Sequence, residues 1–230
     1  MFLQRISIRQ RLVLALFLMS CFCFALSVVR VVATGTLTYL FLNWNLILAA
    51  LPWLASGTVA SLDRLRTHRL ATAFALIVWL LFFPNALYIL TDLFHLRSID
   101  NAPIWFDLVL ILSFAWTGLV FGFASLKHIE SLVGQYVAKP LVNVLVTVLL
   151  FGASFGIYLG RFLRWNSWDV VSQPFCLLDD IAVRVLNPLD HGRTWAVTLL
   201  LGMLLNMMYR TVSLLQNVGL NEPTPVDKHS

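Results

Sequence analysis

Four polar residues, Asn85, Tyr88, Asp92 and His95, follow one another at spacings of three, four and three. An α-helix brings residues three and four apart onto one face, so these side chains form a single polar stripe if the helix continues to His95. A carboxylate or an imidazole in a polar site can act as a general base, and we predict Asp92 or His95 in this catalytic role. Pro84 removes one backbone hydrogen bond directly before the stripe and predicts a kink in the helix.

Arginine, carboxylate and amide side chains in two later segments are the remaining candidates. Arg161 can pair with a carboxylate such as Asp92 or Asp107, and two arginines near a membrane surface suit an anionic lipid headgroup. This combination predicts a hydrolase or transferase site in which Arg161 and Arg164 hold a phosphate. The predicted ligand-binding residues, which include two members of the stripe, are Asn85, Tyr88, Asp107, Arg161, Arg164, Asn166 and Asp169.

Three other interpretations of these residues stay open. The carboxylates and His95 are ligand types that divalent cations use, but Asp-x-x-His is a weak pattern and neither Cys-x-x-Cys nor His-Glu-x-x-His occurs, so we predict no metal site. The charged groups can instead neutralise one another as a structural ion-pair cluster. A helix broken at Pro84, with Asn43 and Asn45 lining a path, is typical of a transporter. The residues indicate no particular cofactor, and they do not decide whether the protein is an enzyme.

The composition indicates that these residues belong to a membrane protein. Of 230 residues, 60% are hydrophobic and 12% are charged, whereas soluble domains contain about 25% charged residues. The predicted fold class is all-α, a polytopic membrane bundle of six transmembrane helices in a single domain over residues 1–216, followed by a flexible cytoplasmic tail over residues 217–230. The six apolar segments are Leu12–Val32, Tyr39–Ala60, Leu70–Leu90, Ile104–Leu126, Pro140–Gly160 and Thr194–Leu215.

The distribution of basic residues predicts the orientation of the bundle. Ten of the sixteen Lys and Arg residues lie in the segments on the side of the N-terminus, and six lie on the other side. Because basic flanks are retained in the cytoplasm, both termini are predicted to be cytoplasmic and the polar residues to face outward. The net charge of +5 is explained by this topology. No basic stripe with interleaved aromatic residues indicates nucleic acid, so the predicted partner is the lipid bilayer.

The longest connection, residues 161–193, is predicted to contain a short helix over Pro174–Asn187. Its apolar residues share one face, namely Phe175, Leu178, Ile181, Ala182 and Val185. An amphipathic helix lying on the outer membrane surface is one interpretation, and a helix that covers the core of the bundle is the other. In the preceding segment, Gly152, Gly156 and Gly160 predict the close approach of another helix.

Two stretches of the sequence resemble a known family. Phe83-Pro-Asn-Ala-Leu-Tyr88 with Thr91-Asp-Leu-Phe-His-Leu96, and Gly160-Arg-Phe-Leu-Arg-Trp-Asn-Ser-Trp-Asp169, are similar to the signature stretches of a bacterial membrane family, domain of unknown function 1361. The resemblance covers the second to sixth predicted helices and implies a bacterial cytoplasmic membrane, without implying an activity. We predict an integral membrane protein whose outward-facing polar cluster acts on a lipid headgroup or envelope component. A small transporter or a structural subunit of a membrane complex is the alternative.

Overall fold

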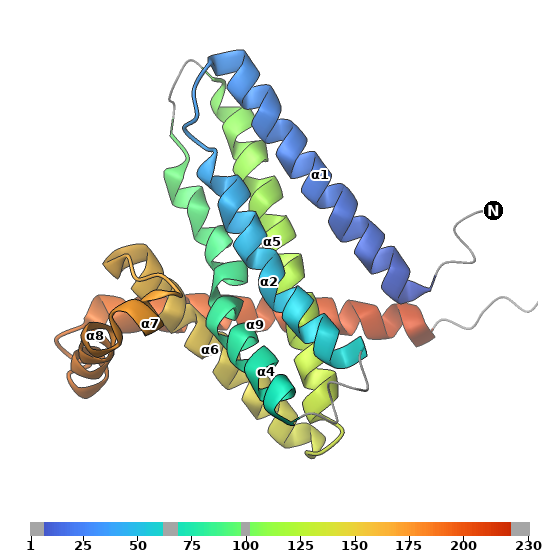
Figure 1. Cartoon of the computed structure of the whole chain (residues 1–230), viewed down its shortest axis with the longest axis vertical. Helices are drawn as coiled ribbons and strands as arrows, with labels where there is room; N and C mark the ends of the chain where they lie inside the picture. The colour runs from blue at the N-terminus through green and yellow to red at the C-terminus, as the bar shows by residue number, and fades with distance from the viewer. Residues whose placement is uncertain (1–6, 62–68, 98–101, 222–230) are drawn as a thin grey trace, which may run out of the picture.

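The protein is built from helices and their connections. The computed structural model describes residues 7–61, 69–97 and 102–221, and no strand occurs within these ranges. Figure 1 shows the helices in chain order. They are α1 (Ile8–Thr34), α2 (Phe41–Ser61), α4 (Arg69–Tyr88), the 3-10 helix η2 (Ile89–His95), α5 (Ile104–Val133), α6 (Lys139–Leu163), α7 (Asp169–Ser172), α8 (Pro174–Leu186) and α9 (Gly192–Asn221).

Five helical segments in the described part of the chain are long and apolar enough to cross a membrane. They are Arg9–Thr34, Leu70–His95, Ile104–Val133, Lys139–Leu163 and Gly192–Gln216. The second predicted span forms α2, which has 21 residues but contains Pro52 and two asparagines and is not among the five. The chain thus has the helices of an integral membrane protein, with five of the six predicted spans supported by length and hydropathy.

Helix α5 is the centre of the bundle. It contacts α2 and α4 on one side and α1 on the other (Figure 1), and buried residues occur from its first turn to Ile129. One hydrophobic core joins α5 to α4 and α6, with Phe83, Leu119 and Leu150 at its centre. A second core joins α5 to α1 and α2 around Leu42 and Phe114.

The glycines of α6 allow α4 to approach, as the sequence predicts for two of the three. A Cβ atom at Gly156 would lie 3.2 Å from the ring of Pro84, and one at Gly160 would lie 3.3 Å from the ring of Tyr88. At Gly152 a Cβ atom would meet nothing within 4 Å. Of these three glycines, the two nearest the C-terminal end of α6 therefore lie against α4, and Arg161 follows them.

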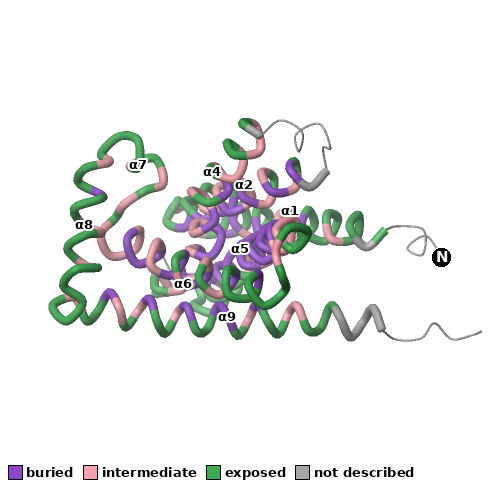
Figure 2. The backbone as a smooth tube through the Cα atoms, turned by 90° about the horizontal axis from the view of Figure 1, so that it is seen from below, coloured by how far each residue is buried: buried purple, intermediate pink, exposed green. Residues whose placement is uncertain are grey.

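Helices α7 and α8 project from the end of α6 to one side of the bundle, and α9 runs across the other helices (Figure 1). The predicted helix Pro174–Asn187 forms as α8 and ends one residue earlier, at Leu186. Figure 2 shows α8 as largely exposed. Phe175 is 84% exposed and Leu186 is 76% exposed, so most of the apolar face of α8 does not pack on the bundle.

Candidate functional site

A cavity of about 330 Å³ lies among α2, α4, η2, α6 and the segment that leads into α8. The polar residues of its lining, which we call the polar wall, are Asn45, Asn85, Tyr88, Asp92, His95, Asn166 and Ser167. The rest is mainly aromatic and aliphatic, including Phe41, Trp44, Leu48, Leu81, Trp165, Trp168, Val170 and Leu177. We call this cavity the main pocket.

The polar stripe of the sequence lies along this pocket. Helix α4 ends at Tyr88, and the chain continues as the 3-10 helix η2, in which residues three apart eclipse one another. Asp92 and His95, three residues apart within η2, therefore lie on the same side, and both line the cavity together with Asn85 and Tyr88. Pro84 provides no N–H for the carbonyl of Leu80.

The segment after α6 fills the space beside the kink. The Ser167 hydroxyl donates to the carbonyl oxygen of Leu81 at 3.0 Å and accepts from Asn85 Nδ2 at 2.8 Å. This carbonyl is next to that of Leu80, which Pro84 leaves without its N–H, and the sequence does not identify Ser167 as a neighbour of this turn. This serine therefore connects the segment after α6 to the stripe on α4.

Arg161 joins the stripe from α6 through all three of its nitrogen atoms. Its Nε donates to Thr91 Oγ1 at 3.0 Å, its Nη2 to Asp92 Oδ1 at 2.6 Å, and its Nη1 lies 2.6 Å from His95 Nε2. The guanidinium carbon also stands 4.6 Å from the centre of the Tyr88 ring. The Arg161–Asp92 pair is one of the two pairings that the sequence analysis considers. We call Arg161, Thr91, Asp92 and His95 the Arg161 cluster.

These contacts define the hydrogen-bonding roles of the cluster. Because a guanidinium only donates, His95 Nε2 must accept, and the ring is a neutral imidazole with its proton on Nδ1. Asp92 is 1% exposed and also accepts from Asn45 Nδ2 at 2.8 Å. The predicted general bases are thus both bonded to Arg161. His95 would have to leave Arg161 before its Nε2 could take a proton, whereas each carboxylate oxygen of Asp92 keeps a second lone pair.

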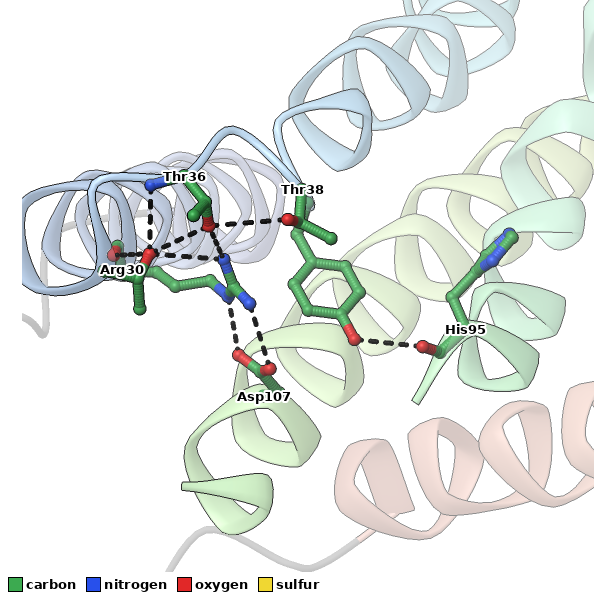
Figure 3. Close-up of polar contacts among 7 residues, drawn as sticks. Arg30, Thr36, Thr38, His95 and Asp107 are labelled. Carbon is green, nitrogen blue, oxygen red and sulfur yellow. Dashed lines mark hydrogen bonds and ion pairs between the residues drawn. The ribbon is translucent and has the colours of Figure 1, made fainter. Parts of the chain in front are cut away.

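Asp107 lies apart from the main pocket in an ion pair with Arg30 of α1. Arg30 Nε contacts Asp107 Oδ1 at 2.7 Å and Nη2 contacts Oδ2 at 3.2 Å. Figure 3 shows the two side chains pointing at each other, with Thr36 above the guanidinium. The sequence groups Asp107 with the outward cluster, but the packing of α1 against α5 gives this carboxylate its own partner.

Tyr39 contacts both this pair and the Arg161 cluster. Its ring lies 4.5 Å from the guanidinium carbon of Arg30, and its hydroxyl donates to the carbonyl oxygen of His95 at 2.9 Å. The two charged groups are therefore linked through one aromatic side chain.

The three remaining predicted residues follow α6 and contribute differently. Asn166 lines the main pocket. Arg164 is exposed and takes a left-handed conformation, with φ 65°, where α6 ends. Asp169 accepts from the Asn166 backbone N–H at 2.7 Å and from Ser172 Oγ at 3.0 Å. The first of these bonds stabilises the carboxylate and lowers the pKa of Asp169 below its usual value.

The structure also identifies residues that the predicted site omits. Asn45 donates a hydrogen bond to Asp92, Thr91 accepts one from Arg161, and Ser167 accepts one from Asn85. The sequence analysis names Asn45 only as part of a transport path, and an asparagine within an apolar helix is the signal that marks it. Thr91 and Ser167 carry no such signal, because small hydroxyl residues are common in membrane helices and loops. In the described ranges, no three His, Cys, Asp or Glu side chains lie close enough together to hold a metal ion.

Comparison with known proteins identifies a family but indicates no activity. No curated protein and no solved structure matches the chain. The family model described as "Protein of unknown function (DUF1361)" matches residues 44–208, a range that includes both signature stretches and the Arg161 cluster. Because this match covers more than half of the 230 residues, the chain belongs to that family.

Proposed function

We propose that the protein is a six-span membrane protein whose main pocket binds the polar head of a membrane amphiphile at the outer surface of a bacterial cytoplasmic membrane. In this arrangement both termini are cytoplasmic, residues 1–216 form one membrane domain, and the lipid bilayer is the surrounding partner. The observation that carries the proposal is the pocket itself, which combines a polar wall with aromatic and aliphatic residues beside an exposed amphipathic helix.

The packing of α2 supports a sixth span. Its 21 residues rise roughly 32 Å, about the thickness of the hydrocarbon core. Asn43 donates to Ser27 of α1 at 2.9 Å, and Asn45 donates to Asp92. Asparagine side chains that bond inside the bundle cost less in a membrane than asparagines facing lipid. The excess of basic residues on the side of the N-terminus supports the proposed orientation.

Helix α8 supports a location at the membrane surface. Its apolar residues Phe175, Leu178 and Val185 are 84%, 60% and 50% exposed. This exposure favours the membrane-surface interpretation over a helix that covers the bundle core. On the other face, Arg184 Nη1 contacts Asp180 Oδ1 at 2.7 Å. Leu177 of α8 lines the main pocket, so the pocket adjoins the helix that we place at the interface.

The state of Asp92 and His95 favours binding over proton transfer. Both bond to Arg161, and Asp92 also bonds to Asn45, so the polar wall is held in a fixed arrangement. Preorganised polar groups beside apolar surface suit an amphiphile whose head meets the wall and whose chain extends past Leu48 and Leu177.

A pair of neighbouring valines provides the test. Val170 lines the main pocket, whereas Val171 is 82% exposed and does not line it. We expect native mass spectrometry of the purified protein to show a retained amphiphile in the wild type and in Val171→Trp, and to show its loss in Val170→Trp. Equal retention in the two variants, or no retained amphiphile in the wild type, would contradict the proposal.

A further inference from the structure

We propose that the main pocket selects an uncharged, polyhydroxylated headgroup, a sugar carried by an amphiphile, over a phosphate. This inference rests on the proposed function and specifies the chemistry of its ligand. It departs from the sequence prediction of an anionic headgroup held by Arg161 and Arg164.

The charge around the pocket does not favour an anion. Neither Arg161 nor Arg164 is among the residues that line the cavity. The charge of Arg161 is matched by Asp92 at 2.6 Å, and the Asp92 side chain itself is part of the lining. A phosphate would therefore enter beside a carboxylate without an arginine or lysine on the described lining to pair with it.

The hydrogen-bonding groups match hydroxyls. Within the described residues, Asn45 and Asn85 each donate one bond, and the side-chain oxygen of neither accepts one. Each amide can thus accept from a ligand and also donate to it with its second N–H. A sugar hydroxyl both donates and accepts, whereas a phosphate dianion only accepts and would leave the amide oxygens unsatisfied.

The aromatic side chains provide flat apolar surface beside these amides. Trp44, Trp165 and Trp168 line the same cavity as Asn45 and Asn85. The face of an aromatic ring carries partial negative charge and attracts the weakly positive C–H groups of a sugar ring, while it disfavours a phosphate. The cavity of about 330 Å³ is at the small end of ligand pockets, which suits a single headgroup.

The test compares ligands that share one alkyl chain. The protein is purified in a polyoxyethylene detergent and titrated with octyl glucoside, octyl phosphate or free glucose, while tryptophan fluorescence is recorded. We expect saturable binding of octyl glucoside, at least about tenfold tighter than octyl phosphate, because the amide oxygens lose their donors with phosphate. Free glucose should bind more weakly than octyl glucoside because it lacks the chain.

Two variants and a matched control locate the binding. Asn85→Leu should weaken the binding of octyl glucoside about tenfold. The control is Asn143→Leu, which replaces an exposed asparagine of α6 and should leave this binding unchanged. Trp44→Leu should also weaken the binding of octyl glucoside. Trp44 is 56% exposed and makes no hydrogen bond within the described residues, so this variant keeps the test valid if Asn85→Leu does not fold.

The outcomes separate the two proposals. Octyl phosphate that binds as tightly as octyl glucoside would overturn the sugar inference and leave the amphiphile proposal in place. Free glucose that binds as tightly as octyl glucoside would support a sugar site and overturn the amphiphile proposal. Absence of saturable binding by all three ligands, or equal binding by wild type and both pocket variants, would overturn both.

Discussion

Arg30 and Asp107 form a bidentate ion pair in which the two side chains are 2% and 0% exposed. Removing one partner of such a pair leaves an uncompensated buried charge, which typically costs about 3–5 kcal/mol. We therefore expect Arg30→Met to lower the apparent Tm of the purified protein strongly. The double variant Arg30→Met with Asp107→Leu should recover most of that loss, because neither charge remains. A double variant as unstable as the single one would show that the pair also holds the helices by geometry.

The Arg161 cluster allows stability and ligand binding to be measured separately. Asp92→Leu alone should destabilise the protein by about 3–5 kcal/mol, since Arg161 loses its carboxylate. Adding Arg161→Met should restore the Tm. The restored double variant should still bind octyl glucoside less tightly, because Asp92 is part of the pocket wall. Wild-type affinity in the double variant would mean that Asp92 serves the fold alone.

Close packing of α4 on α5 depends on Gly118. A Cβ atom there would meet the side chain of Ile89 and lie 3.0 Å from the carbonyl oxygen of Ala86. Gly118→Ala should destabilise the protein by about 1–3 kcal/mol, measured as a lower Tm.

Gly152 provides the matched control for this prediction. A Cβ atom at Gly152 meets nothing within 4 Å, so Gly152→Ala should leave the Tm unchanged or raise it slightly. If the two alanine variants melted at the same temperature, the packing of α4 on α5 would differ from the one described here.

The proposed topology can be tested with the natural cysteines. Cys176 on α8 is exposed, whereas Cys21 and Cys23 lie within the membrane segment of α1. A membrane-impermeant maleimide added to intact cells should label the wild type and should not label Cys176→Ser. Labelling of Cys176 only after the cells are opened would place α8 and the main pocket on the cytoplasmic side.

The sequence predicts correctly what periodicity within one helix determines. The spacing from Asn85 to His95 predicts that four side chains share one side, and all four line the main pocket although α4 ends at Tyr88. The pairing of Arg161 with a carboxylate also followed from its type and position. In contrast, the partner of Asp107 depends on which helix packs against α5, and spacing within α5 carries no information about that choice.

Arg30 and Glu130 show the same limit. Arg30 lies inside the first predicted segment, where nothing in the sequence names its partner, and in the structure it is buried against Asp107. Glu130 lies beyond the predicted apolar segment Ile104–Leu126, and in the structure it accepts hydrogen bonds from Lys127 and Tyr209. The contacts with Asp107 and Tyr209 join helices that are distant in sequence, and spacing within one helix does not reveal them.

The Arg30–Asp107 pair also constrains how the protein is made. The two residues are 77 positions apart, and only Asp107 lies within the segment that the family model matches. At about 5–20 residues per second, the ribosome adds Asp107 roughly 4–15 seconds after Arg30. During that interval the first helix carries an arginine without its carboxylate. Burial of the Arg30 guanidinium, and with it the final packing of α1, therefore waits for α5.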